Sequence, residues 1–378
     1  AFENARTRLE ALLKIQPNNL ELLTLAGANA FWLGQLHYDK SNYAAAEPLL
    51  KKYHTYSEIM YSLAPNDFNS IMELSYSHNS LGSLYLKQFN YTAAKQRFTE
   101  SLALKNKALE LKPNNKNLLR DKADTISWLA KTEERLGNFN TAVDMLENAV
   151  KVVNKMTAHY RDDASLFYMS ANILMQQSYL LSYLTDKKIA YLKARFANEI
   201  INEAIKQDPK NNEFQHMYYR SLAQLVMLSD DKRTDSRIKN IISFLGIQDF
   251  KSNITINIQI ILIQYFIERN SLTKAQELLT SLESDEDYKK HTAKQIKIGD
   301  NVAFTNIYLL KAKLAATSEQ REQLCLNALQ AIAKTATINQ SIKITYPLVQ
   351  AYTCLNRANE IPEIKASLVK FGITNFQL

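Results

Sequence analysis

The chain has few of the residues that turn-rich, nucleotide-binding or metal-binding folds require. It is 378 residues long, yet it contains only 7 glycines, 7 prolines and 2 cysteines. β-Sandwiches and barrels use far more Gly and Pro in their turns, and two cysteines cannot form a disulfide framework or a cysteine-based metal site. No glycine-rich phosphate-binding motif occurs. These absences favour a helical fold, and we expect no cofactor.

Long hydrophobic runs and metal-type histidine spacings are also missing. No apolar run reaches the roughly 18 residues of a membrane span, so none is predicted. The 6 histidines show neither HxxxH nor HExxH spacing, and no metal site is expected. The net charge is +8, but lysines alternate with acidic residues and no long basic block occurs. The sequence therefore disfavours nucleic acid as a partner and allows a mild preference for acidic partners.

Prolines recur at a fixed interval. Pro17, Pro65, Pro113 and Pro209 are separated by 48, 48 and 96 residues, and Arg161 stands where the missing proline would be. Asn or Asp follows closely each time, which fits a helix end followed by the N-cap of the next helix. The predicted N-caps are Asn19, Asp67, Asn115 and Asp163.

Small and apolar residues keep the same period. A small residue at a fixed place in each of two helices allows the pair to cross closely, because no branched side chain separates them. One such column is Gly34, Gly82, Ala130 and Ser178, and the other is Ala46, Ala94, Ala142 and Ala190. Leu50, Phe98 and Leu146 form an apolar column that would be buried.

Residues 81–98, LGSLYLKQFNYTAAKQRF, resemble the tetratricopeptide repeat (TPR) pattern of Leu-Gly, Tyr and then Ala-x3-Phe. His78 stands at the Trp position. An ordinary TPR has about 34 residues, so a 48-residue period lengthens each helix by about two turns. The resemblance implies an all-α, TPR-like right-handed α-solenoid of stacked antiparallel helix hairpins with elongated helices.

The resemblance also predicts the domain organisation. Because the chain starts without Met and inside a helical pattern, we expect residues 1–19 to be the end of a truncated first repeat. Residues 20–211 would hold the regular repeats, and residues 212–378 degenerate repeats and a C-terminal cap. First helices are expected near 20–39, 67–87, 115–136, 163–184 and 212–228, second helices near 43–63, 91–111, 139–157 and 187–207, later helices within 254–279, 300–335 and 340–370, and polar loops at 230–237 and 284–291.

In the TPR family the first helix of each hairpin lines the concave, ligand-binding face. The resemblance therefore implies a peptide-binding surface of aromatic anchors, amides for a peptide backbone and cations for carboxylates. Solvated helix faces are the other interpretation of these positions. The predicted binding residues are Phe31, Met72, Tyr76, Asn79, Asn117, Arg120, Lys131, Tyr168, Asn172, Tyr179 and Arg220.

Other chemically versatile residues are predicted to be structural. We expect His78 to be a packed histidine and Trp32 and Trp128 to be packing residues. No nucleophile, base and orienting residue can be assembled, so no catalytic residue is assigned. Three further pairs complete the prediction. Cys325 and Cys354 are expected to be buried free thiols, and Glu133–Glu134 and Asp230–Asp231 to be surface charge.

The sequence thus predicts a non-enzymatic scaffold that binds a protein or an extended peptide, with a mild preference for acidic partners. Similar extended TPR arrays look like sensor or adaptor parts of larger bacterial signalling proteins. The alternative is a small-molecule or peptide sensor that closes around its ligand, which an enclosed pocket near 210–260 would favour. Localisation is left open between the cytoplasm and the extracytoplasmic part of an anchored protein.

Overall fold

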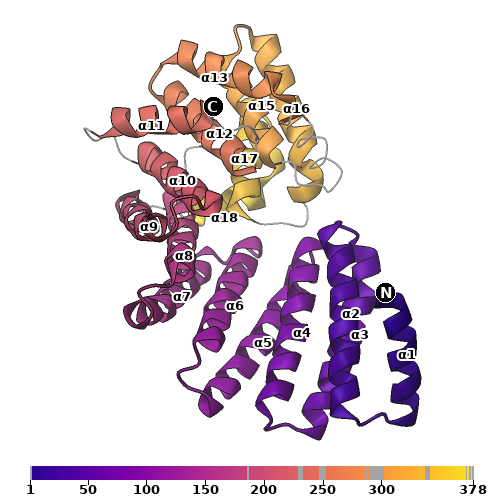
Figure 1. Ribbon diagram of the computed structural model, residues 1–378. Coiled ribbons are helices and arrows are strands. Elements are labelled where there is room, and N and C mark those ends of the chain that lie inside the picture. Colours follow the sequence, from indigo (N-terminus) through magenta and orange to yellow (C-terminus); the bar gives the residue numbers. More distant parts are fainter. Residues whose placement is uncertain are drawn as a thin grey trace. The chain divides into compact units, whose positions relative to one another are not determined.

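All regular structure in the described part of the chain is helical (Figure 1). The chain divides into two compact units, Ala1–Met156 (unit 1) and Thr157–Leu378 (unit 2). The all-α, TPR-type solenoid fold that the sequence predicts is confirmed. The structure, a computed structural model, describes residues 2–184, 187–228, 233–246, 253–286, 288–289, 302–336, 341–371, 373 and 376.

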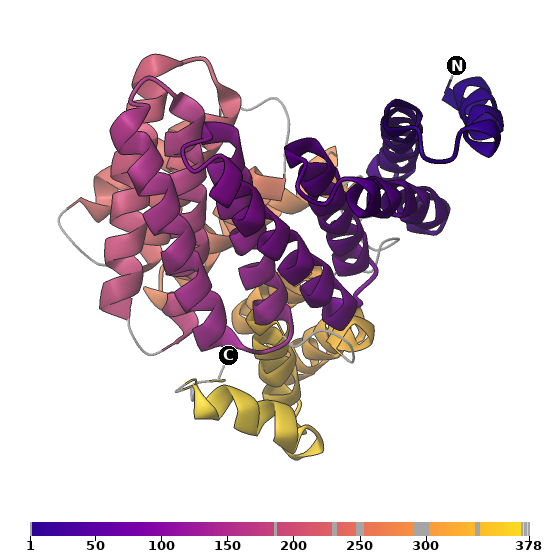
Figure 2. The ribbon, with the colours of Figure 1, turned by 90° about the horizontal axis from the view of Figure 1, so that it is seen from below.

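Unit 1 consists of one single helix followed by three pairs of long helices. Its helices lie side by side in a row (Figure 1), with the N-terminal helix at the outer end (Figure 2). The second helix of one pair packs on the first helix of the next. The bounds are α1 (Phe2–Ile15), α2 (Leu20–Asp39), α3 (Tyr43–Leu63), α4 (Phe68–Lys87), α5 (Tyr91–Leu111), α6 (Lys116–Arg135) and α7 (Phe139–His159).

Unit 2 continues with helix pairs whose first helices form a contiguous series. α8 contacts α10, α10 contacts α12, α12 contacts α15, and α15 contacts α17. The bounds are α8 (Ala164–Tyr183), α9 (Lys187–Gln207), α10 (Asn212–Leu228), α11 (Thr234–Gly246), α12 (Asn253–Glu268), α13 (Leu272–Ser284), α15 (Val302–Leu314), α16 (Ser318–Ala336), α17 (Ile342–Cys354), the 3-10 helix η1 (Ala358–Glu360) and α18 (Pro362–Lys370).

The first eight long helices start at regular intervals. Helices α2 to α9 have 20 or 21 residues each, which corresponds to about 30 Å. The superposition of these pairs as copies of one repeat stays a prediction. First helices begin at Leu20, Phe68, Lys116 and Ala164, and second helices at Tyr43, Tyr91, Phe139 and Lys187, 48 residues apart in each step.

Side-chain caps fix where these helices begin. The predicted caps Asn19, Asp67, Asn115 and Asp163 each accept a hydrogen bond of 2.8–3.1 Å from a backbone N–H of the first turn. Asn42 and Asn90 cap α3 and α5 in the same way, at 3.4 and 3.2 Å, which the sequence analysis missed. Each cap contributes roughly 1 kcal/mol.

Small residues bring the two helices of a pair into close contact, as predicted. A Cβ on Gly34 would lie 2.8 Å from Leu50 Cδ2, and a Cβ on Gly82 would lie 2.8 Å from a ring carbon of Phe98. In the fourth pair, Ser178 Oγ donates a 2.7 Å hydrogen bond to the carbonyl of Ala190. The alanines at 46, 94, 142 and 190 are all fully buried.

Two predicted loops are partly wrong. α11 begins at Thr234, inside the predicted loop 230–237, because Thr234 and Arg237 extend the buried stripe of Ile238 and Ile241 by one turn. In the predicted loop 284–291, Tyr288 is helical and only 6% exposed. The pair Asp230–Asp231 lies outside the described residues.

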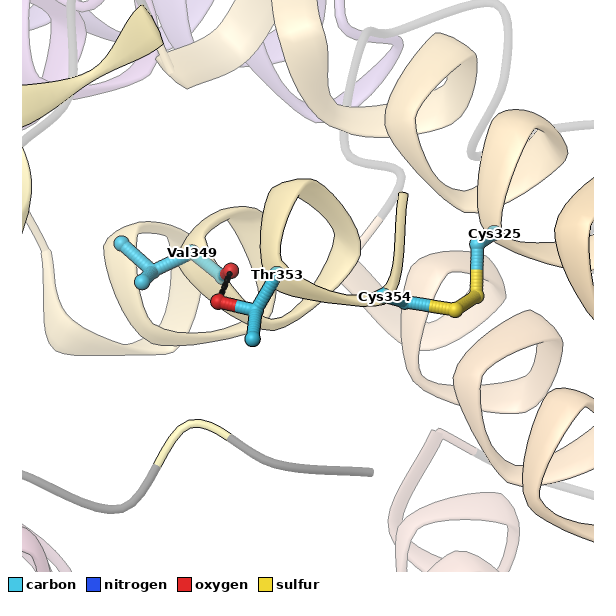
Figure 3. The surroundings of a disulfide bond; sticks show 4 residues. All are labelled: Cys325, Val349, Thr353 and Cys354. Carbon is cyan, nitrogen blue, oxygen red and sulfur yellow. Dashed lines mark hydrogen bonds between the residues drawn. A yellow bond between two sulfur atoms is a disulfide. The ribbon is translucent and has the colours of Figure 1, made fainter. Parts of the chain in front are cut away.

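The predicted free thiols are wrong: Cys325 of α16 and Cys354 of α17 form a disulfide (Figure 3). The two residues are 29 positions apart in sequence, and their Cα atoms are 6.3 Å apart. Helix pairing brings them together, because Cys325 lies on the buried face of α16 and Cys354 ends α17. The disulfide therefore ties the last long helix of unit 2 to its neighbour.

Candidate functional site

The predicted binding residues fall into two groups, one in each unit. Each group lies on first helices of successive pairs, and we describe each by itself. The unit 1 group comprises Phe31 on α2, Met72, Tyr76 and Asn79 on α4, and Asn117, Arg120 and Lys131 on α6; the unit 2 group comprises Tyr168, Asn172 and Tyr179 on α8, and Arg220 on α10.

In unit 1, two predicted binding residues tie α4 to α6. Tyr76 donates its hydroxyl hydrogen to Asp121 Oδ2 at 2.8 Å. Asn79 Nδ2 donates to Thr125 Oγ1 at 3.1 Å, and the threonine hydroxyl lies 3.3 Å from Asn79 Oδ1. Tyr76 is still 38% exposed. These side chains hold neighbouring repeats together and leave the tyrosine ring accessible to a partner.

Arg120 and Asn117 are the most accessible members of the unit 1 group. Both are exposed on α6, and neither forms a hydrogen bond or ion pair among the described residues. Lys131 lies 4.8 Å above the ring of Trp128. The indole N–H of Trp128 donates to Asp124 Oδ2 at 3.1 Å. This face of α6 therefore offers cations and an aromatic ring together.

Other predicted residues of unit 1 are packed. Met72 is 5% exposed in a core cluster with Ile71 and Leu118, so it is a core residue in this structure. Phe31 is half-buried, with its ring centre 5.6 Å from that of Tyr53. The packing role predicted for Trp32 is wrong, because its side chain is 54% exposed.

The packing role of Trp128 is confirmed, whereas the surface role of Glu133 is not. Trp128 stacks on Phe98 with an interplanar angle of 11°. Glu133 is 2% exposed. Its carboxylate pairs with Lys95 at 2.7 Å and accepts a 2.7 Å hydrogen bond from Asn138 Nδ2. Glu133 thus bonds α6 to α5 and to the turn before α7, so its burial is compensated.

In unit 2, Arg220 is the central residue of the group. The burial of its guanidinium lowers the pKa of Arg220, while the nearby Tyr168 and Tyr179 act in the opposite direction. No carboxylate pairs with Arg220 among the described residues. A half-buried cation without a counter-ion favours the binding of an anion, because the ion pair would offset the desolvation of the guanidinium.

Aromatic and amide side chains lie on the same two helices as Arg220. The ring of Tyr168 lies 5.7 Å from that of Phe214, between centres. Asn172 follows Tyr168 by one turn of α8 and is half-buried. The hydroxyls of Tyr179 and Tyr183 are hydrogen-bonded at 2.8 Å. The α8–α10 face thus combines one cation, one amide and several phenols.

Helix α17 reaches this face, which the sequence analysis missed. The ring of Tyr346 on α17 lies 5.3 Å from Tyr183 and 6.0 Å from Phe376, between centres. Burial, with smaller effects of Tyr183 and Glu268, raises the pKa of Tyr346 to about 12. The contact brings α17 against α8, the first helix of unit 2. No periodic pattern connects residues 183 and 346, so no sequence signal could have found it.

A buried lysine lies beneath the unit 1 group. Lys105 of α5 is fully buried, and its ammonium donates to Ser75 Oγ at 2.9 Å and to Ser101 Oγ at 2.8 Å. No carboxylate pairs with it within salt-bridge distance among the described residues. Burial therefore lowers the pKa of Lys105 to about 8, although Asp121 and Asp124 act in the opposite direction.

Lys105→Met is expected to stabilise unit 1 by about 1–3 kcal/mol at pH 7, because it removes a buried charge and leaves Ser75 and Ser101 hydrogen-bonded to each other. The folded-state pKa is lowered, so the cost of Lys105 is complete below about pH 8 and disappears toward pH 10.5. The stabilisation of Lys105→Met relative to the wild type, measured by denaturant unfolding, should therefore shrink as the pH rises from about 8 toward 10.5. Lys151→Met, at an exposed position of α7, is the control. A destabilised Lys105→Met protein would contradict the prediction.

A hollow of about 650 Å³ in unit 2 lies against α13 and α15, and none of its lining residues belongs to the predicted binding groups. The alternative function predicted a pocket near 210–260, and this hollow lies outside that range. It is open and mostly apolar, with Glu277 as its one titratable group. Its lining residues are Leu272, Thr273, Gln276, Glu277, Thr280 and Leu314.

Two searches confined to the described residues concern other classes of site. Within them, no group of three or more His, Cys, Asp or Glu side chains is arranged to hold a metal ion. No helix there is long and apolar enough to cross a membrane.

The comparison with known proteins gives a likeness of fold. No protein-family model and no curated protein sequence matches the chain. Among solved structures, the apo form of the quorum sensor NprR from B. thuringiensis is similar over 98% of this chain and 96% of its own, with 11% identity and a TM-score of 0.52. Yeast Tom70 covers 99% of this chain and 82% of its own, with 11% identity and a TM-score of 0.44. The NprR likeness shows a common fold.

Proposed function

We propose that the chain is a non-enzymatic scaffold with extended, TPR-like repeats that binds a protein or an extended peptide along its first helices. The observation that carries this proposal is the α8–α10 face, where Arg220 lacks a carboxylate partner among the described residues and lies beside Tyr168 and Tyr179. Aromatic rings and arginines are the side chains that most often anchor partners. An acidic segment of the partner fits both Arg220 and the net charge of +8.

The proposed place of this scaffold is the sensor or adaptor part of a larger signalling protein. NprR is a quorum sensor, and its common fold with this chain supports a sensor role by analogy alone. Such a role needs a binding face rather than catalytic groups. Glu133 and Tyr76, which could perform acid–base chemistry, are instead bonded to neighbouring helices.

A sensor that closes around its ligand is the second candidate. It is favoured by the contact of Tyr346 with Tyr183 and Phe376, which brings α17 next to the end of α8. A ligand at Arg220 would lie near this contact and could strengthen it. The two candidates differ in whether ligand binding slows the amide hydrogen exchange of α17.

The disulfide supports the extracytoplasmic alternative for localisation. Disulfides persist in oxidising compartments and are rare in the cytosol. Cys325 is fully buried and lies in the core region between α16 and α17. We therefore propose that the chain works outside the cytoplasm.

Fluorescence anisotropy with labelled peptides of equal length and of acidic, neutral or basic composition tests the function. We expect the acidic peptides to bind most tightly. Hydrogen exchange of the complex should show protection on α8 and α10. Additional protection of α17 would favour the closing sensor over the open scaffold. Failure of every peptide class to bind, or protection confined to α13–α16, would contradict the proposed function.

A further inference from the structure

Two buried histidines and one arginine join three helices of unit 1. His54 lies on α3, His78 on α4 and Arg97 on α5. The two imidazole ring centres are 4.5 Å apart. Arg97 Nη1 lies 3.2 Å from His54 Nε2 and 3.3 Å from His78 Nδ1. The same Nη1 also lies 3.3 Å from Glu100 Oε2 on its own helix. Because a guanidinium only donates hydrogen bonds, an imidazole nitrogen that accepts from Arg97 carries no proton.

The hydrogen bonds of Ser77 fix the tautomer of His54. Ser77 Oγ donates to the carbonyl oxygen of Leu74 at 2.8 Å, and the same Oγ lies 2.9 Å from His54 Nδ1. Since the serine hydrogen is already used, Nδ1 donates to Oγ and holds the imidazole proton. Nε2 of His54 therefore presents its lone pair to Arg97.

A carboxylate lies beside each accepting nitrogen. Glu58 Oε1 is 3.4 Å from His54 Nε2, and Glu100 Oε2 is 3.1 Å from His78 Nδ1. A neutral nitrogen that presents a lone pair cannot bond to a carboxylate, whereas a protonated one donates to it strongly. Neutral His54 thus has Arg97 as its partner, and protonated His54 has Glu58. Protonated His78 donates to Glu100, which also pairs with Arg97 at 3.3 Å.

We propose that this cluster is a proton-operated joint of unit 1. In neutral medium Arg97 bridges the two histidines and connects α3, α4 and α5. In acid the histidines donate to Glu58 and Glu100 instead, so Arg97 loses both imidazole acceptors and keeps its ion pair with Glu100 on its own helix. The arginine side chain is 27% exposed and Glu58 is 58% exposed, so the released groups have direct access to water. Loss of the bridge loosens the packing of the three helices.

The surrounding charges keep the histidines neutral while the bridge is closed. Burial is the largest effect on His78 and lowers its pKa to about 3, and His54, Arg97 and Lys105 add to this effect. Burial also lowers the pKa of His54, and Arg97 assists while Glu58 and Glu100 oppose. These groups come from α3, α4 and α5, the three helices that meet at the cluster.

The direction of the shift sets the pH range. In the closed form, with the Arg97 bridge intact, the pKa of His78 is about 3. In the opened form, with the bridge broken, it returns to the ordinary value of about 6.5. Between these two pH values the opened form therefore binds more protons than the closed form. The stability contributed by the cluster is fully present above about pH 6.5 and is lost as the pH falls below it. For His78 alone, the opening equilibrium should rise about 30-fold between pH 7.5 and pH 5.

Histidine NMR titration tests the joint directly, with Arg97→Met as the decisive variant. In the wild type, His54 and His78 should titrate below the ordinary histidine value of about 6.5, because burial lowers both pKa values. Arg97→Met should raise both midpoints, because a neighbouring positive charge is removed while Glu58 and Glu100 remain. Arg8→Met, at an exposed position of α1, should change neither.

Amide hydrogen exchange, corrected for its intrinsic pH dependence, reports the loosening itself. Between pH 7.5 and 5 it should accelerate about tenfold or more in α3–α5 of the wild type and much less in α8–α10. Midpoints near the ordinary histidine value in the wild type would overturn the proposal. Unchanged midpoints in Arg97→Met, or equal acceleration in both units, would do the same. If Arg97→Met does not fold, the wild-type midpoints decide.

Discussion

Replacing Gly82 with valine is expected to lower the free energy of unfolding of unit 1 by about 2 kcal/mol or more. A Cβ at this position would lie 2.8–3.0 Å from three ring carbons of Phe98. The ring is fully buried and stacks on Trp128, so it cannot move aside without disturbing α6. The extra methyl groups would therefore separate α4 from α5. Denaturant unfolding followed by far-UV circular dichroism measures the loss.

Gly246→Val is the matched control, because a Cβ at Gly246 meets no atom within 4 Å. Because nothing is displaced, it should not lower the free energy of unfolding. The somewhat higher helix propensity of valine would raise it slightly. Combining Gly82→Val with Phe98→Leu should recover part of the loss, because the smaller side chain leaves room for the valine. A Gly82→Val protein as stable as the wild type, or a control that is equally destabilised, would show that the helices do not cross closely there.

The fold of the N-terminal half was predictable because its physical requirements recur. Each long helix pair needs a cap such as Asn115 and a small residue such as Gly82, and a fixed period makes these positions visible. In the C-terminal part the period fades, and polar residues no longer indicate loops. Thr234 and Arg237 are polar, yet they are buried at the start of α11. The buried face of this helix begins one turn before its first large hydrophobic residue, Ile238.

Contacts between distant positions were the least predictable. The Cys325–Cys354 disulfide and the Tyr183–Tyr346 contact depend on how helices pack across unit 2, and neither follows a period. A lysine such as Lys105 is normally expected on a solvated helix face. Here it is buried, because Ser75 and Ser101 provide oxygen acceptors in the interior. Burial of a charge is decided by partners on another helix, which a single sequence does not reveal.

The candidate site was predicted in outline, but its residues also serve another role. Tyr76 and Asn79 were assigned to ligand binding, and the structure bonds them to Asp121 and Thr125 of α6. The partners are 45 and 46 residues apart, close to one period, because the face that a ligand would contact also connects successive repeats. The assignment of this face to a ligand stays a prediction.

Arg220→Gln is expected to weaken binding of the tightest acidic peptide about 10- to 100-fold. A hydrogen-bonded charge pair contributes about 1.5–3 kcal/mol, and about 1.4 kcal/mol corresponds to a factor of ten in Kd. Tyr168→Ala should add to the loss by removing an aromatic contact on the same face. Arg120→Gln tests the unit 1 group in the same assay, and its effect would show that the peptide also contacts α6.

Arg195→Gln provides the matched control for these variants. Arg195 lies on the second helix α9, is 46% exposed and pairs with Glu199 one turn away at 3.4 Å. The control removes the same charge from the chain, so it separates a specific contact from a change in net charge. Anisotropy titrations at low and moderate salt should show a shallower salt dependence for Arg220→Gln than for Arg195→Gln, because a contact with the peptide anion has been lost. Equal affinities of the Arg220→Gln and Arg195→Gln proteins, both with unchanged helicity and melting temperature, would place the carboxylate elsewhere and remove Arg220 from the site.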